Sequence, residues 1–415
     1  MIAPIAAVHP TDGVASTPEA TLDRWVQRRV SIIWSLLFVN GLGFIGASVV
    51  PTPKPLAQLF TMGALAFALL LALRLNPRLE IRPNLVLGLV SVLAVTATAT
   101  SLRGLSGTGA GFRSARFLCF VAVLWLLTPW WGRRDLLLAR CHLRAVIAVS
   151  GLVLLGLVVA PGLALSGGGQ GRLVGALWPI PAPQVAQYAA LASGLSLVMW
   201  LSGAMAARPA LFVTGVGAAI LMASQTRTAL VGWVAGIVAA GLTSFVFQRR
   251  FRTAAMAGLF LLPVVLVLMG PALYAWFTRD QTADQLANLT GRKTVWATLV
   301  DAPRPEFNQW LGFGLSDKSF NGLSIDSTWL AAYQDEGLVG VGIVAAIFLF
   351  LLVVPAFRPA GPARAVATFI VVYCLIASYT EVGIGDASNY LLAMVAAASM
   401  VTAVGRDEPR GWPAA

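Results

Sequence analysis

The chain has 415 residues, of which 58% are hydrophobic and only 11% are charged. One water-soluble core cannot bury that much apolar surface, so the composition excludes an ordinary soluble domain and predicts an all-α polytopic membrane protein. The formal net charge of +12 is explained by the placement of basic residues between apolar segments, and it does not indicate nucleic acid as a partner.

Apolar segments of membrane-spanning length recur along the chain. A transmembrane helix needs roughly 20 mostly apolar residues. Twelve segments are candidates, and they begin near Ser31, Leu56, Asn84, Arg116, Leu143, Pro183, Pro209, Thr228, Thr253, Thr328, Ala363 and Ser388. We therefore expect about 12 transmembrane helices.

Polar segments flank and interrupt this integral membrane domain, which we place at residues 30–404. Residues 1–29 are polar and precede the first span, and we expect them to form a disordered cytoplasmic tail. They lack the charged stretch followed by a short apolar core that marks a cleavable signal peptide, so none is expected. Residues 405–415 form a second polar tail, and residues 277–326 form one large hydrophilic loop between spans 9 and 10.

The basic residues indicate the orientation, because short loops rich in Lys and Arg stay in the cytoplasm. With the N-terminus inside, the cytoplasmic segments hold 18 of the 29 basic residues and 7 of the 17 acidic ones, a net charge of +11. The outer segments hold the other 11 basic and 10 acidic residues, a net charge of +1. We therefore predict that both termini are cytoplasmic and that the large loop is extracytoplasmic.

Three arginines on the predicted outer face lie in small-residue or tightly held settings. Arg172 lies in the Gly-rich run 166–175, Arg227 in a short connection before a span, and Arg292 in the large loop. Arginine near a span is costly and usually has a partner, and its planar guanidinium binds two phosphate oxygens at once. Pairing with outer acids or anchoring at headgroups is the alternative. Since outer acids are not in excess, we predict a phosphate or diphosphate site.

Carboxylates at the entry to the tenth span are the candidate general bases. Asp326 precedes that span and is the leading candidate, with a helix cap as the alternative. Glu336, a few turns into the helix, is the second, and Glu381 or Asp386 in the last outer loop is the third. Within the large loop, residues 290–300 are predicted to form a short helix.

These residues, in this order, resemble the O-antigen ligase and polysaccharide polymerase (Wzy-like) superfamily over roughly residues 172–390. The resemblance lies in five short motifs: Arg172 with Gly175; Gln225-Thr226-Arg227-Thr228-Ala229-Leu230 at the start of a span; Gly291-Arg292 with Trp296; Gly312 and Gly314; and Asp326 with Leu330, followed by Glu336-Gly337-Leu338 and Gly340.

The resemblance implies a GT-C-like membrane glycosyltransferase that uses no metal and no cofactor. It implies transfer of glycan from a polyprenyl diphosphate on the outer face of the bacterial cytoplasmic membrane. Arg172, Arg227 and Arg292 would hold the diphosphate, and Asp326 or Glu336 would be the catalytic carboxylate. The implied partners are polyprenyl-diphosphate-linked oligosaccharide, a glycan acceptor, the lipid bilayer, a flippase and a chain-length regulator.

One departure from the family favours a polymerase. Ligases of this kind typically carry a histidine at the end of the large loop, where this chain reads Ser324-Ile325-Asp326-Ser327. A ligase that attaches finished glycan to another acceptor is the alternative within the family. A 12-span secondary transporter is the alternative from another class, and it predicts ionisable residues or broken helices deep in two corresponding halves of the chain.

Overall fold

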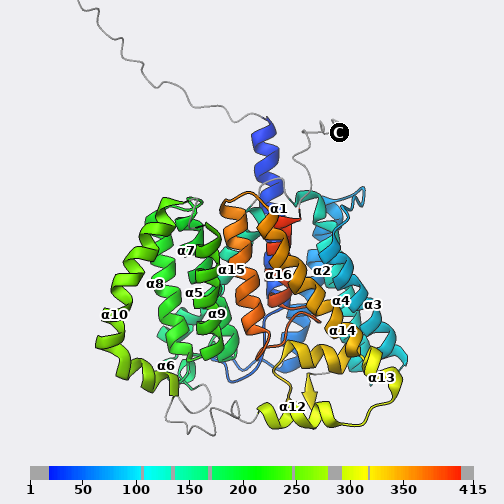
Figure 1. Cartoon of the computed structure of the whole chain (residues 1–415). Coiled ribbons are helices and arrows are strands. Elements are labelled where there is room, and N and C mark those ends of the chain that lie inside the picture. The colour runs from blue at the N-terminus through cyan, green and yellow to red at the C-terminus, as the bar shows by residue number, and fades with distance from the viewer. Residues whose placement is uncertain are drawn as a thin grey trace, which may run out of the picture.

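The computed structural model describes residues 18–103, 107–131, 136–166, 171–244, 248–278, 292–315 and 318–402. Within these ranges, regular structure is almost entirely helical, apart from one two-stranded sheet (Figure 1). The predicted all-α polytopic class is confirmed at this level by a set of long apolar helices.

A helix covers each of the twelve segments predicted as spans. They are α1 (Pro18–Asn40), α2 (Lys54–Leu75), α3 (Leu85–Arg103), α4 (Gly107–Leu126), α5 (Leu137–Val159), α7 (Ala182–Leu201), α8 (Ala207–Ser224), α9 (Arg227–Ser244), α10 (Arg249–Thr278), α14 (Thr328–Val353), α15 (Pro362–Ala377) and α16 (Asn389–Val401). By length and composition, 7 helices in the described part of the chain can cross a membrane, or up to 8 if the two halves of α10, bent by 60°, form one span. The number of spans beyond these stays a prediction.

Short elements connect the long helices. They are η1 (Thr128–Trp130), α6 (Pro161–Ala164), α12 (Arg292–Asp301), α13 (Glu306–Leu311), β1 (Ser319–Phe320), β2 (Leu323–Ser324) and η3 (Val354–Phe357). Helices α12 and α13 and the two strands belong to the loop 277–326 and lie together at one end of the bundle (Figure 1). We call this the loop end.

The N-terminal helix is longer than the sequence indicated. Residues 1–29 were predicted to be a disordered tail, but α1 already begins at Pro18. Val26 and Val30, one helical turn apart, are both buried against the bundle, which stabilises the helix before the first apolar stretch. Residues 1–17 and the predicted tail 405–415 lie outside the described residues.

Three helices form the centre of the bundle. Every residue of α16 is buried, and α7 and α15 are buried along most of their length. Helices α15 and α16 lie in the middle of the view in Figure 1, between the helices at its two sides. Because protein rather than lipid surrounds these helices, they do not need the length or the apolar composition of a lipid-facing span.

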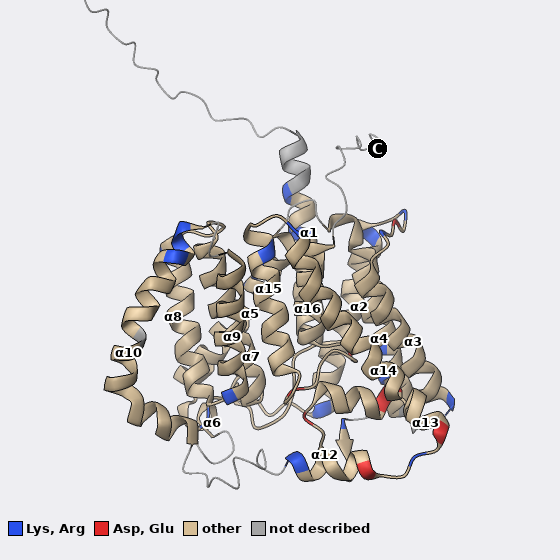
Figure 2. Cartoon of the chain, in the orientation of Figure 1, with Lys and Arg blue, Asp and Glu red and all other residues tan. Residues whose placement is uncertain are grey.

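The charges differ between the two ends of the bundle (Figure 2). Acidic side chains gather at the loop end, around α12, α13 and the start of α14, where basic side chains accompany them. The starts of α10 and α15 at the other end carry the basic residues Arg249, Arg250, Arg252 and Arg364. Which end faces the cytoplasm stays a prediction.

Helix α14 is broken at Gly337, where φ is 66° and ψ is −157°. A break removes hydrogen bonds within the helix, and the freed carbonyls need other partners because buried polar groups are costly. The carbonyls of Gln334 and Asp335 accept the main-chain N–H groups of Phe313 and Gly314, each at 2.9 Å. The segment that follows α13 therefore completes the hydrogen bonding of the broken helix.

Glycine permits this contact between two main chains. Gly312 and Gly337 have φ angles of 73° and 66°, in the left-handed region. A Cβ atom on Gly312 would overlap the main chain of Asp335, and one on Gly337 would overlap the main chain of Trp310. The break thus fixes the position of the loop end on α14.

A tight hairpin leads from the loop into α14. Strands β1 and β2 pair in antiparallel fashion, with Phe320 opposite Leu323. The turn residues Asn321 and Gly322 have φ angles of 51° and 77°. Positive φ at both positions is typical of a type I′ turn, for which Asn-Gly is strongly preferred. The hairpin places Asp326 directly before Ser327, which is the N-cap residue of α14.

We expect the substitution Gly337→Ala to lower the free energy of unfolding by at least about 2 kcal/mol, because the Cβ atom meets main chain and the left-handed φ is strained. Gly342→Ala, in the same helix, is the matched control, since no atom lies within 4 Å of a Cβ there. Thermal unfolding in detergent would show a large drop in the midpoint for Gly337→Ala only. Equal midpoints for the two variants would contradict the proposed role of the break.

Candidate functional site

The connection between α15 and α16, residues 378–388, ties together the starts of two other helices at the loop end. The Thr380 hydroxyl donates to the Thr228 hydroxyl in the first turn of α9 at 2.8 Å. The Thr328 hydroxyl, at the start of α14, donates to the main-chain oxygen of Glu381 at 2.6 Å. The N-terminal ends of α9 and α14 therefore meet beside Glu381, and helix N-termini favour negative charge.

Arg172 lies next to the connection between α8 and α9. Its Nε donates to the main-chain oxygen of Ser224 at 3.2 Å, and its Nη2 donates to the Thr226 hydroxyl at 3.2 Å. Removal of water lowers the pKa of Arg172, and the negative charge of Glu381 opposes that effect. An arginine keeps its proton under such conditions. It therefore adds a fixed positive charge where α9 begins.

Arg227 is the first residue of α9. Its Nη2 donates to the main-chain oxygen of Thr278, the last residue of α10, at 3.0 Å. The guanidinium also lies over the Phe277 ring, 5.5 Å from the ring centre. These contacts hold the end of α10 beside the start of α9.

Arg292 and Asp326 form an ion pair across the loop. Arg292 Nε lies 3.3 Å from Asp326 Oδ2, and the side chains are 29% and 38% exposed. The Ser324 hydroxyl donates to the other carboxylate oxygen of Asp326. The helix cap considered for Asp326 is not observed, since Ser327 is the N-cap of α14. At this exposure the pair itself adds only about 1 kcal/mol or less to stability, because solvent screens it.

Helix α12 is docked by its inward face. The Trp296 indole N–H donates to the main-chain oxygen of Ile325 at 2.7 Å, and its ring packs edge-on against Tyr379 at 5.3 Å between centres. Leu299 is fully buried in a small apolar cluster with Ile325. These contacts hold Arg292 beside Asp326. The start of the predicted helix, including Thr290 and Gly291, lies outside the described residues.

Glu381 lies among these charges. Burial raises the pKa of Glu381 to about 8; the positive charges of Arg292 and Arg172 lower it, and the negative charge of Asp326 raises it. The carboxyl group of Glu381 is therefore mostly protonated at neutral pH. The structure thus brings all three predicted arginines together with Asp326 and Glu381, and we call these five residues the arginine–carboxylate cluster.

Glu336 occupies a different place. It is fully buried at the break in α14, and neither carboxylate oxygen has a hydrogen-bond partner among the described residues. The charged groups that act on it are Lys318 and Asp386. Its neighbour Asp335, also fully buried, forms an ion pair with Lys318. Glu336 is thus set apart from the arginine–carboxylate cluster.

Arg304 is a loop arginine that the sequence did not single out. It donates to the main-chain oxygens of Leu299 at 3.2 Å and Tyr333 at 3.3 Å, and to Gln334 Oε1 at 2.8 Å. Its guanidinium lies 4.2 Å from the centre of the Tyr333 ring. Arg304 therefore clamps α12 onto the first part of α14. These partners are distant in the sequence or are main-chain atoms, so no local sequence pattern predicts the role of Arg304.

The cluster can bind an anion and can exchange a proton. It holds three guanidinium groups, the Asp326 carboxylate in its ion pair with Arg292 and, at neutral pH, a largely protonated carboxyl at Glu381, which leaves an excess of two positive charges. Among the described residues, no group of three or more His, Cys, Asp or Glu side chains is placed to hold a metal ion. The three arginines can supply charge stabilisation at this site.

We expect the stability of the protein to fall as the pH rises from about 4.5 to about 8, because the pKa of Glu381 is raised from 4.5 to about 8 on folding. A carboxyl whose pKa is raised binds its proton more tightly in the folded state, so its contribution is fully present below pH 4.5 and is lost as the pH passes the folded pKa. Glu381→Gln should remove this part of the dependence. Unfolding midpoints with the same pH profile for both proteins would contradict it.

Comparison with known proteins does not assign the chain to a family. No protein-family model and no curated protein matches this chain.

Proposed function

We propose that the protein is a membrane glycosyltransferase that polymerises polyprenyl-diphosphate-linked glycan on the outer face of the bacterial cytoplasmic membrane. The proposal includes twelve spans, cytoplasmic termini and a loop end on the outer side. The observation that carries it is the convergence of Arg172, Arg227 and Arg292, from three separate connections, at one end of an apolar helix bundle.

Charge balance supports a diphosphate as the bound group. A diphosphate esterified at both ends carries two negative charges, which equals the excess positive charge of the arginine–carboxylate cluster. The start of α9, at Arg227, adds the partial positive charge of a helix N-terminus. Negative charge on the diphosphate grows as the anomeric bond breaks, so cations placed around it favour the transition state over the ground state.

The ion pair between Arg292 and Asp326 supplies a base. In the free protein Arg292 Nε lies 3.3 Å from Asp326 Oδ2, so the carboxylate is engaged with the guanidinium. A bound diphosphate competes for Arg292, which frees Asp326 to accept the proton of the acceptor hydroxyl as that oxygen attacks the anomeric carbon. Glu381, protonated at neutral pH, is a poor base until it loses its proton.

A secondary transporter is the second candidate, because α14 is broken and carries the buried acids Asp335 and Glu336. Broken helices with ionisable residues are typical of transporters, which show them in corresponding positions of two halves. Helix α10, which is also bent within the described part of the chain, has Pro263 at its bend and no Asp, Glu, His, Lys or Arg between Arg252 and Thr278. Of these two bent helices only α14 combines a break with buried acids, which favours the transferase.

The test is elongation in reconstituted vesicles supplied with polyprenyl-diphosphate oligosaccharide. We expect Arg172→Ala, Arg292→Ala and Asp326→Ala each to slow the appearance of longer glycan by about a hundredfold or more, the usual effect of removing a charge-stabilising group or a base. Arg103→Ala is the matched control. Arg103 also lies at the loop end, but it stacks on Phe307 at 3.9 Å and does not belong to the cluster.

Persistent elongation in both Arg292→Ala and Asp326→Ala would contradict the site. If the wild type elongates no repeat unit but moves a solute across the vesicle membrane, transport replaces transfer. Attachment of finished glycan to a different acceptor, without growth of the repeat, would identify a ligase. Prior incubation with a metal chelator should leave the rate unchanged, since arginine supplies the charge stabilisation in this account.

A further inference from the structure

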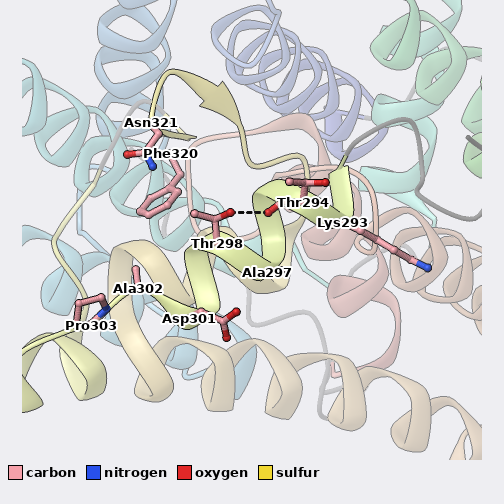
Figure 3. A pocket seen from close by; sticks show the side chains of 9 residues that line it. All are labelled: Lys293, Thr294, Ala297, Thr298, Asp301, Ala302, Pro303, Phe320 and Asn321. Carbon is pink, nitrogen blue, oxygen red and sulfur yellow. Dashed lines mark hydrogen bonds between the residues drawn. The ribbon is translucent and has the colours of Figure 1, made fainter.

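The side of α12 that faces away from the arginine–carboxylate cluster lines an open surface cavity of about 850 Å³ (Figure 3). The inward residues Arg292, Trp296 and Leu299 contact the hairpin and the start of α14. The cavity is lined instead by residues about half a helical turn away, including Thr294 and Thr298. The ten-residue helix α12 thus carries Arg292 of the arginine–carboxylate cluster on one side and lines this second site with its other side.

The lining residues offer mixed chemistry that suits neither a lipid tail nor a diphosphate. Thr294, Thr298, Asp301 and Asn321 supply two hydroxyls, a carboxylate and an amide, and all four are exposed. The Thr298 hydroxyl donates to the main-chain oxygen of Thr294 at 2.8 Å, which leaves its oxygen able to accept another hydrogen bond. The charges of Lys293 and Asp301 offset each other.

Phe320 gives the cavity an aromatic wall. Its ring faces into the cavity between the hairpin and α12 in Figure 3. The ring is half-buried because it also packs against the apolar cluster around Leu299 and Ile325. A fixed aromatic ring beside hydroxyl, amide and carboxylate groups matches a sugar, which has an apolar face of C–H groups and a rim of hydroxyls that act as donors and acceptors.

We propose that this cavity, the α12 pocket, binds the growing glycan chain a short distance from its diphosphate. The inference rests on the proposed function, because it assigns the chain of the same donor to the opposite side of α12. Lys293, which lines the pocket, follows Arg292 directly in the sequence. A chain that leaves a diphosphate held at Arg292 passes the N-terminal end of α12 and reaches the pocket within one helix diameter of roughly 10 Å.

The consequence is retention of the product. After each transfer, the polyprenyl diphosphate that has lost its chain must leave. Binding of the glycan in the α12 pocket keeps the chain near the arginine–carboxylate cluster for the next cycle. The α12 pocket therefore increases the number of additions made before the chain is released, whereas the arginine–carboxylate cluster determines the rate of one transfer.

The test uses the purified full-length protein and oligosaccharides made by partial acid hydrolysis of the polysaccharide of the source cell. Binding is followed by saturation-transfer NMR and calorimetry. We expect Phe320→Leu, which removes the ring but keeps an apolar side chain, and Thr298→Val, which removes one hydroxyl, each to weaken binding by about tenfold. Asn321→Gly removes the amide and still permits the positive φ of the turn.

Val300→Thr is the matched control, because Val300 is exposed on α12 but does not line the cavity. In vesicles, the pocket variants should give shorter glycans at a nearly unchanged rate for the first addition. Oligosaccharide binding that is equal in all variants, or products of unchanged length, would overturn the proposal.

Failure of the pocket and failure of the proposed function give different results. If the wild type elongates glycan but binds no free oligosaccharide, the pocket assignment is wrong and the transferase stands. If oligosaccharide binding is lost in Phe320→Leu but no lipid-linked donor is ever elongated, the pocket stands and the transferase is wrong. Arg172→Ala should slow elongation by about a hundredfold or more and leave oligosaccharide binding intact.

Discussion

The contact between the Gly312–Gly314 segment and the break in α14 holds the loop end in place. In a bilayer, a helix that breaks must find other partners for its freed carbonyls, because water is absent. Here the N–H groups of Phe313 and Gly314 supply them. Arg304 and the ion pair between Lys318 and Asp335 add further links to the same part of α14. These contacts fix the loop end on α14, and they thereby fix the positions of α12 and the hairpin.

The arginine–carboxylate cluster depends on this docked loop end and on the connection 378–388. The connection 378–388 is bound at one end to the starts of α9 and α14, and at the other end Arg116 donates to the main-chain oxygen of Ala387 at 2.9 Å. Glu381 is held between them. Three arginines in one place repel one another, so rigid supports and intervening carboxylates are needed to keep them together.

The sequence predicts the long helices well, because the length of an apolar segment is a local property. The hairpin also had a local signal, Asn321-Gly322, which is typical of a type I′ turn. The centre of the bundle had no such local signal in the sequence. Helix α16 is short and apolar, and its burial depends on the helices around it. The position of Glu381 likewise depends on contacts with α9, about 150 residues earlier, which hydrogen bonds such as Thr380 to Thr228 reveal.

The surroundings of Glu336 do not follow from the linear motif. In the sequence it follows Asp326 by a few turns of helix and is predicted as a second candidate base. The break at Gly337 and the overlying Gly312–Gly314 segment bury it instead, beside Gly385 and away from the arginines. A break of this kind needs a partner segment to satisfy its carbonyls, so its presence depends on tertiary structure.

The most direct test of the central claim is the binding of polyprenyl diphosphate, compared with polyprenyl monophosphate, to the purified protein in nanodiscs. If the three arginines form a diphosphate site, the diphosphate should bind at least about tenfold more tightly, and Arg172→Ala and Arg292→Ala should remove that preference. Equal affinity for the two lipids in the wild type, or an undiminished preference in both variants, would contradict the account.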